Sequence, residues 1–466
     1  MKLGLWIAIT IAIVLYLLPL PLTREGHGML AISGLATALW ISEAIPMPAT
    51  ALLIAIGVIC LGIAPAAEVF SVFADPLIFL FVGSFILAEA MQIHGLDKRL
   101  AQAILRTPWV RARASRMIFA YCSISFLISM WVSNAATTAM LYPIGLSIIK
   151  IFEKEDEKAL APYILLMTSF GASIGGMATP VGTPPNLIGI GFLRTLTGQS
   201  ISFGRWMLMA LPISVATFLF IYFAMQRFYS RKALKDSMPE ISLGDPDPHQ
   251  RRAQNNVAIA FGVTVFLWLL PSFILLSGGD PKILDTRLPE SVAAVIGALL
   301  LFFLPVDFKK HQFTITWKQA QNINWGIILL FGGGLVLGKF LFKSGVAKYI
   351  GDSLAAIYPF HSEFMYILLF TLLAVFISEF TSNTASANLI LPICIAVCQA
   401  ASINPLRPAL AATLASSLGF MLPVSTAPNA IVYGSGMIPI RSMVRYGIVL
   451  DISGSIFVAA GVYWLT

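Results

Sequence analysis

Four short polar clusters interrupt otherwise apolar stretches of this 466-residue sequence. Two of them are the Ser-Asn pairs Ser133-Asn134 and Ser382-Asn383. The other two are Thr183-Pro184-Pro185-Asn186, which follows Gly182, and Thr426-Ala427-Pro428-Asn429. Proline removes a backbone donor and glycine permits an unwound path, so such breaks expose both ends of a helix. Freed carbonyl and amide oxygens suit a monovalent cation such as Na⁺, whereas helix N-termini suit a carboxylate.

The four clusters contain no Lys or Arg. An anion bound there would be held by hydroxyls, amides, helix dipoles and a co-bound cation, so its binding would depend on the cation, as in a symporter. A single Asn in a spanning helix is more often an interhelical hydrogen-bonding residue than a ligand. Four Asn residues at paired breaks favour the binding interpretation: Asn134, Asn186, Asn383 and Asn429.

The surrounding composition defines the elements that position these clusters. The chain is 58% hydrophobic and 11% charged, against about 25% charged in soluble domains. Its apolar runs are continuous and about 17 to 25 residues long, which is the length of membrane-spanning helices rather than of barrel strands. We predict an all-α polytopic membrane protein with 11 transmembrane helices, near residues 4–22, 29–45, 50–64, 76–93, 161–193, 206–226, 255–277, 291–304, 326–342, 408–437 and 446–465.

Two further apolar stretches, 117–151 and 364–400, are too long for one span and carry the Ser-Asn pairs at their centres. We expect both to be re-entrant hairpins whose tips face a polar site, because irregular backbone at membrane depth must line protein or a wet cavity. The helices 161–193 and 408–437 are predicted to be broken at their Thr-x-Pro-Asn motifs.

The sequence also contains an internal repeat. Segments 81–87 and 331–337 match, and the Ser-Asn pairs and the Thr-x-Pro-Asn motifs then match in the same order. We therefore predict two inverted repeats, 1–226 with scaffold helices in 1–93, and 255–466, joined by a cytoplasmic linker at 227–254. Inverted repeats with interrupted helices are typical of secondary transporters.

Charged residues fix an orientation. Most of the 30 Lys and Arg residues fall in loops on one side of this topology, which places the N-terminus in the cytoplasm and the C-terminus outside. The net charge of +8 is then a topogenic and lipid-binding signal, not a sign of nucleic-acid binding. Among acids in apolar context, Glu43 and Glu89 are interpreted as helix-end or interhelical residues, and Glu379 as a candidate near the site. Lys339 is expected to extend to the membrane interface.

At these motifs the sequence resembles the divalent anion/sodium symporter family, which includes the sodium-dicarboxylate cotransporters. The matching segments are 131–140, 182–186, 382–385, 426–429 and 42–46. The resemblance implies a homodimer of protomers with a scaffold domain and a transport domain that moves as an elevator. It also implies that the substrate carboxylates are held by Ser133, Asn134, Ser382, Asn383 and Thr384.

The same resemblance places sodium at Asn134 and Asn383 with the backbone around Gly182 and Ala427, and we include Ser133 in this set. The neighbouring Thr137, Thr183, Pro184, Thr426 and Pro428 complete the predicted substrate site. One departure from the family pattern is Ala135, which replaces a hydroxyl in the first signature. No organic cofactor is expected.

We therefore expect a sodium symporter that imports C4-dicarboxylates such as succinate, malate or fumarate across a bacterial inner membrane. The alternative within the family is a sodium-independent exchanger of dicarboxylates, 2-oxoglutarate or tartrate. A channel and an intramembrane hydrolase are remoter alternatives. A hydrolase would need a Ser/His pair, an Asp pair or a metal site at membrane depth, and the five histidines fall in predicted loops or span ends.

Overall fold

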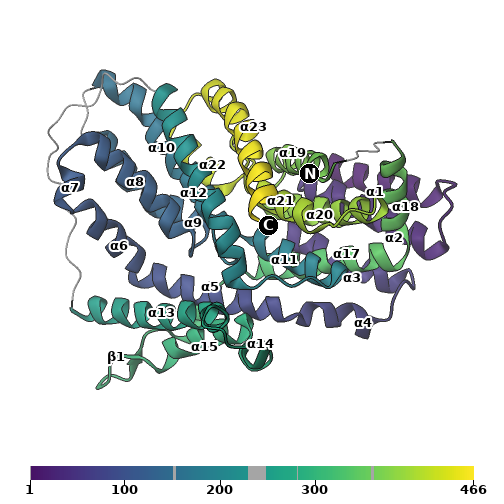
Figure 1. Cartoon of the computed structure of the whole chain (residues 1–466), viewed down its shortest axis with the longest axis horizontal. Coiled ribbons are helices and arrows are strands. Elements are labelled where there is room, and N and C mark those ends of the chain that lie inside the picture. The colour runs from purple at the N-terminus through teal and green to yellow at the C-terminus, as the bar shows by residue number, and fades with distance from the viewer. Residues whose placement is uncertain (1, 151–153, 229–247, 281, 358–361) are drawn as a thin grey trace.

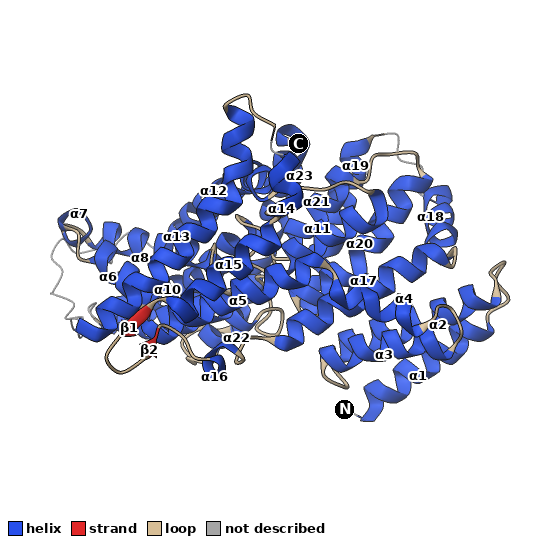
Figure 2. Cartoon of the chain, turned by 90° about the horizontal axis from the view of Figure 1, so that it is seen from below, coloured by secondary structure: helices blue, strands red, loops and turns tan. Residues whose placement is uncertain are grey.

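The computed structural model describes residues 2–150, 154–228, 248–280, 282–357 and 362–466, and within them the chain is almost entirely helical (Figure 2). The helices of the first half are α1 (Lys2–Leu17), α2 (Arg24–Ser42), α3 (Met47–Cys60), α4 (Ala66–Ser71), α5 (Pro76–His94), α6 (Leu96–Leu105), α7 (Pro108–Arg111), α8 (Ala114–Ser129), α9 (Asn134–Ile149), α10 (Lys154–Met177), α11 (Pro184–Thr197) and α12 (Phe203–Phe228). A 3₁₀ turn, η1 (Val72–Ala74), connects α4 to α5.

The second half contains α13 (Pro248–Leu276), α14 (Lys282–Arg287), α15 (Glu290–Phe303), α16 (Trp317–Ala320), α17 (Trp325–Lys343), α18 (Val346–Ile357), α19 (Glu363–Phe380), α20 (Asn383–Ala400), α21 (Leu406–Ala415), α22 (Ala427–Tyr433) and α23 (Ile440–Leu465). Two short antiparallel strands, β1 (Pro305–Asp307) and β2 (Gln312–Phe313), form a hairpin after α15. In Figure 1, α6, α8 and α10 lie toward one end of the molecule and α1, α2 and α18 toward the other.

The described helices confirm a polytopic membrane architecture. Eight segments are long and apolar enough to cross a membrane: Ala66–His94, Leu160–Met177, Phe203–Arg227, Gln250–Leu276, Trp325–Lys343, Glu363–Phe380, Asn383–Ala400 and Ile440–Leu465. Five shorter apolar helices accompany them, including the pair α8 and α9. The count of 11 spans and the re-entrant placement of the hairpins stay predictions, since α19 and α20 are each 18 residues long.

Both predicted hairpins are helix pairs that turn at the Ser-Asn motif. The first turns between Ser129 and Asn134, and the second between Phe380 and Asn383. Both predicted broken helices are also interrupted, between α10 and α11 and between α21 and α22. The second interruption is longer than the motif alone indicates, because α21 already ends at Ala415.

Some boundaries differ from the sequence prediction for local reasons. Helix α2 begins at Arg24, five residues before the predicted start, because the side chain of Thr23 accepts a hydrogen bond from the Gly26 N–H at 3.1 Å. It ends at Ser42 because Glu43 adopts a left-handed conformation with φ of 48°. Glu43 is therefore a helix-end residue, as predicted.

Two amphipathic helices, α6 and α18, were not predicted. Each follows a glycine with positive φ, Gly95 (66°) and Gly345 (78°), which ends the preceding apolar helix. They are only 10 and 12 residues long, which is too short for a membrane span, so the length of apolar runs does not predict them. Most of the predicted linker 227–254 lies outside the described residues.

Close glycine contacts pack the long helices. A Cβ on Gly83 of α5 would lie 2.5 Å from the carbonyl carbon of Ala294 on α15, and one on Gly333 of α17 would lie 2.6 Å from Cα of Ala51 on α3. The glycine run in α17 is thus a helix-packing surface rather than a nucleotide loop.

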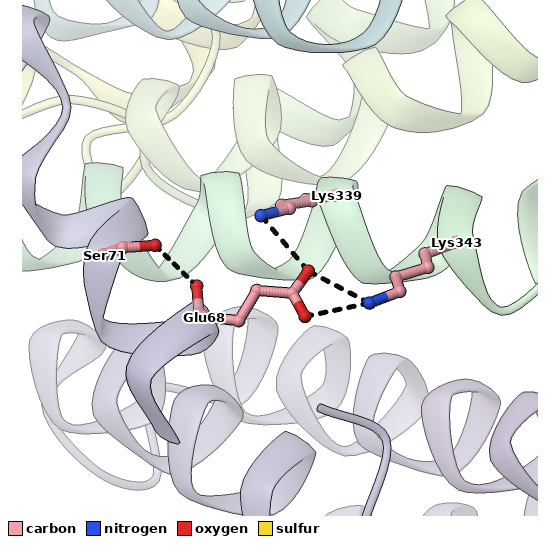
Figure 3. Close-up of polar contacts among 4 residues, drawn as sticks. All are labelled: Glu68, Ser71, Lys339 and Lys343. Atoms are coloured by element: carbon pink, nitrogen blue, oxygen red, sulfur yellow. Dashed lines mark hydrogen bonds and ion pairs between the residues drawn. The ribbon is translucent and has the colours of Figure 1, made fainter. Parts of the chain in front are cut away.

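Lys339, which was expected to extend to the membrane interface, belongs to an ion-pair cluster. Its Nζ lies 3.4 Å from Glu68 on α4, and Nζ of Lys343 lies 2.9 Å from the other oxygen of the same carboxylate (Figure 3). Ser71 donates to the Glu68 carbonyl at 2.8 Å within α4. The two lysines therefore tie α17 to α4 by an ion-pair cluster.

Candidate functional site

The tip of the α8–α9 pair is organised by a serine and an asparagine. The Oγ of Ser133 accepts the Ala136 N–H at 3.3 Å and so caps α9. The buried Asn134 is held through its Oδ1, which accepts the hydroxyl of Ser129 at 2.7 Å. These bonds fix the Asn134 amide at the N-terminus of α9, where unpaired N–H groups and the helix dipole favour an anion.

The break between α10 and α11 is held by the amide of Asn186. Its Nδ2 donates to the carbonyls of Gly176 at 2.8 Å and Thr179 at 2.7 Å. Asn186 is fully buried, so these bonds replace helix hydrogen bonds that the unwound path from 178 to 183 has lost. The motif asparagine thus stabilises the break from inside.

The tip and the break meet directly. A Cβ on Gly176 would collide with the amide of Asn134, and a Cβ on Gly182 would lie 2.9 Å from the Met130 carbonyl oxygen. The hydroxyl of Thr179 donates to that same carbonyl. Neutral amide and carbonyl oxygens therefore converge where the first hairpin touches the first break, which is a suitable set of ligands for a hard cation.

The second hairpin repeats this arrangement. The Oγ of Ser382 accepts the Ala385 N–H at 3.2 Å, and the Oδ1 of Asn383 accepts the hydroxyl of Ser378 at 2.8 Å. Ser378 also lies 2.8 Å from the Ser416 carbonyl, at the end of α21. The second tip is thereby joined to the second break, as the first tip is joined to the first.

The break between α21 and α22 is held in the same way by Asn429. Its Nδ2 donates to the carbonyls of Gly419 at 2.7 Å and Leu422 at 3.0 Å. Thr426 caps α22 by accepting the Asn429 N–H at 3.2 Å. Thr183 occupies the corresponding position before α11 but makes no side-chain cap.

One hydrogen bond connects the long helix of the first repeat to the break of the second. Ser169, on α10, donates to Oδ1 of Asn429 at 2.6 Å, and both residues are buried. The Oδ1 of Asn186 has no hydrogen-bond partner among the described residues. In addition, α22 packs against α9 and α10, and α11 packs against α20 and α21. The short helices of each repeat thus lie among the helices of the other.

A cavity of about 190 Å³ opens beside the first cluster. Ser133, Gly182 and Pro184 form part of its wall, and the opposite side is polar, with Glu89 on α5 and Asn322 and Asn324 before α17. Within the described structure, this cavity gathers three predicted site residues of the first repeat and none from the second. Glu89, interpreted from sequence as a helix-end or interhelical residue, lines this cavity.

The remaining predicted site residues differ in exposure. Ser133 and Ala427 are exposed, and Pro184 is half-buried with Ser382, Asn383 and Thr384. Thr137, Thr183, Thr426 and Pro428 are buried, and the hydroxyl of Thr137 has no partner among the described residues. The structure therefore places Thr137 behind the tip rather than at its surface.

Sequence reasoning missed three serines that orient the motif asparagines. Ser129 and Ser378 each lie four residues before the motif serine, so comparing the two repeats could have identified both. Ser169 has no such signal, because its partner lies 260 residues away.

Glu379, the candidate near the site, binds backbone. Its Oε1 accepts the Met421 N–H at 2.8 Å and its Oε2 accepts the Leu422 N–H at 3.0 Å. It therefore holds the unwound segment after α21 rather than facing the cavity of the first cluster.

Known proteins resemble this chain over nearly its whole length. The family model described as "Sodium:sulfate symporter transmembrane region" matches residues 1–466. The sodium-dependent dicarboxylate transporter SdcS of Staphylococcus saprophyticus is 32% identical over 95% of this chain and 87% of that protein. An uncharacterized transporter of Haemophilus influenzae is 32% identical over 96% of this chain and 94% of its own length.

A solved structure has a similar fold. The crystal structure of the YdaH transporter of Alcanivorax borkumensis superimposes with a TM-score of 0.59, covering 94% of this chain and 98% of that one, at 16% sequence identity. This similarity concerns the fold alone.

Proposed function

Because the chain belongs to the sodium:sulfate symporter family of membrane transporters, we propose that it imports C4-dicarboxylates such as succinate, malate or fumarate by symport with Na⁺. The family places it among transporters rather than enzymes. Its substrate class and its coupling ion are the parts that we propose.

The observation that carries the proposal is the pair of neutral clusters. In each, a serine-capped helix N-terminus and an oriented asparagine, Asn134 or Asn383, lie against an unwound segment. Helix N-termini attract carboxylates, and amide and carbonyl oxygens attract Na⁺. The motifs supply no cationic side chain, so sodium provides the positive charge that a dicarboxylate needs.

The names of two relatives support the same substrate. The SdcS proteins of Staphylococcus saprophyticus and Staphylococcus aureus are named sodium-dependent dicarboxylate transporters, and the second is 31% identical over 97% of this chain. We assign the sodium sites to Asn134 and Asn383 with Ser133 and the backbone of Gly182 and Ala427. The carboxylate contacts are assigned to the two Ser-Asn signatures and the helix starts at Pro184 and Pro428.

The proposed architecture is a homodimer in a bacterial inner membrane with a cytoplasmic N-terminus. The hairpins α8–α9 and α19–α20 and the broken helices form the transport domain, which moves as an elevator against a scaffold that includes the helices of 1–93. The repeated bonding of Asn186 and Asn429 supports the division into inverted repeats.

Transport by the purified protein in liposomes tests the proposal. Labelled succinate should accumulate in empty vesicles when a Na⁺ gradient is directed inward, and should not when choline replaces Na⁺. Vesicles preloaded with unlabelled succinate are the comparison for exchange. Uptake that needs internal succinate and ignores the Na⁺ gradient would establish the exchanger and refute symport. Saturation and counterflow distinguish a carrier from a channel.

A further inference from the structure

Two buried acids lie against the unwound segment between α21 and α22. Glu379, on α19, is fully buried, and Asp451, on α23, is 4% exposed. Both carboxyl groups accept hydrogen bonds from consecutive residues of this segment, Phe420 for Asp451 and Met421 for Glu379, so the two acids lie side by side. The proposed transport mechanism uses neither of them, and both stand in helices long and apolar enough to span a membrane.

Together the two carboxyls hold three consecutive backbone groups. Glu379 accepts the N–H groups of Met421 and Leu422 at 2.8 and 3.0 Å, and Oδ1 of Asp451 accepts the Phe420 N–H at 3.2 Å. The Oδ2 of Asp451 accepts no N–H or O–H from the described residues. An ionised carboxylate can only accept hydrogen bonds, so a proton on one of these two adjacent acids removes one negative charge and gives the pair a donor.

On the described helices that pack around the pair, the cationic side chains are exposed or paired elsewhere. Helices α20, α21 and α23 pack against α19, and α12, α19 and α21 pack against α23. On these helices Arg205, Arg227, Arg441 and Arg445 are exposed, and Arg407 pairs with Glu363 at 2.9 Å. Apart from Glu363 and the two acids themselves, the other described titratable groups on these helices are tyrosines and cysteines: Tyr222, Tyr366, Tyr446, Tyr463, Cys394 and Cys398. Two adjacent buried carboxylates without a cation are strongly unfavourable.

In the first repeat, the described hydrogen bonds of the break come from an amide and a hydroxyl rather than from a carboxyl group. Met130 stands where Glu379 stands in the second repeat, since Ser129 and Ser378 bond Asn134 and Asn383 in the same way. Met130 uses its backbone carbonyl, which accepts the hydroxyl of Thr179. A helix break of this type therefore does not need carboxyl groups, and the acidic pair is a feature of the second repeat.

We propose that Glu379 and Asp451 form a proton-binding site, in which the two carboxyls share one proton and fix the backbone of Phe420–Leu422. The proton comes from water and lowers the charge of the pair from two negative charges to one. Its release leaves two facing carboxylates, whose repulsion loosens this segment and, through it, Thr426 and Asn429 at the start of α22. The site makes the second break sensitive to pH whatever anion the protein carries.

Gly447 strengthens the connection between the pair and the segment. It lies one turn before Asp451, and a Cβ there would collide with Cα of Met421. The segment is thus in close contact with α23. A movement of the acidic pair must therefore move the segment as well.

Infrared spectroscopy of the full-length protein in nanodiscs tests this site without transport. The wild-type protein should show the C=O stretching band of a protonated carboxylic acid that persists at neutral pH and disappears in alkali. Asp451→Asn should lose the band, because its amide N–H replaces the shared proton toward Glu379. Glu379→Gln should lose it too. Glu363→Gln should keep the band, because Glu363 lies on the same helix as Glu379 but is paired with Arg407 of α21.

Thermal unfolding without Na⁺ or dicarboxylate gives an independent readout. The native state holds one more proton than the unfolded chain at neutral pH, so the stability of the wild type should fall as pH rises. We expect the midpoint to drop by about 4 °C or more from pH 6 to 9, and Asp451→Asn to lose most of that pH dependence. A wild type without the titrating band, or an Asp451→Asn variant that keeps both the band and the pH dependence, overturns the proposal. Neither readout involves sodium-coupled transport, so the two proposals fail separately.

Discussion

The hydroxyl of Ser169 donates to Oδ1 of Asn429 at 2.6 Å, across 260 residues of sequence. The bond links the long helix of the first repeat to the break of the second. Asn429 meanwhile donates through Nδ2 to two carbonyls of its own break. A single side chain therefore couples the geometry of both halves of the candidate site.

Ser169→Ala should destabilise the protein and weaken its response to sodium. It leaves Oδ1 of Asn429 buried without a donor, at a cost of about 1–3 kcal/mol. Thermal unfolding with increasing Na⁺ measures both effects. Ser453→Ala is the control, since Ser453 bonds only carbonyls of its own helix at 2.8 and 3.2 Å. Equal behaviour of the two variants would show that the Ser169 bond does not support the site.

Ala412→Ser should stabilise the protein. Ala412 is the repeat counterpart of Ser169, and it is fully buried on α21, which packs against α11. A hydroxyl there is expected to reach the unpartnered Oδ1 of Asn186, with a gain of about 1 kcal/mol. Ala411→Ser, at the adjacent buried position, should only destabilise. If both variants lower the unfolding midpoint alike, the repeat correspondence does not extend to this pair.

Asn383→Ala should impair both cation and dicarboxylate binding. It removes the amide that Ser378 orients at the second tip, and a hydrogen bond to a charged ligand contributes about 1.5–3 kcal/mol. We expect the Na⁺ concentration for half-maximal stabilisation to rise at least about tenfold. Asn255→Ala, on the exposed surface of α13, should match the wild type. A normal sodium response in Asn383→Ala would remove this residue from the site.

Ala135→Thr should change substrate preference. It restores the hydroxyl of the family signature beside Ser133, at a half-buried position in the first turn of α9. Competition of unlabelled dicarboxylates against labelled succinate uptake measures the preference, with Ala139→Thr at an exposed position of the same helix as control. An unchanged order of competitors at normal expression would show that position 135 does not contact the substrate.

The pattern of the sequence predicts the hairpin tips and the helix breaks because Ser, Asn, Pro and Gly in apolar runs have local structural consequences. The bonds that orient the site are less local. Ser129 and Ser378 were accessible through the repeat, whereas the contacts of Ser169 with Asn429 depend on packing between halves. The role of Glu379 could not be predicted from the sequence either, because its partners are backbone groups of an unwound segment more than forty residues later.

The most direct test of the central claim is succinate binding to the purified protein with and without Na⁺. If sodium supplies the positive charge at a site whose motifs have no Lys or Arg, replacing Na⁺ by choline at constant ionic strength should weaken succinate binding by about 100-fold, within the usual range of coupling free energies. Isothermal titration measures this ratio, and Na⁺ affinity should rise equally with saturating succinate. Succinate affinity that is the same in Na⁺ and in choline would contradict the account.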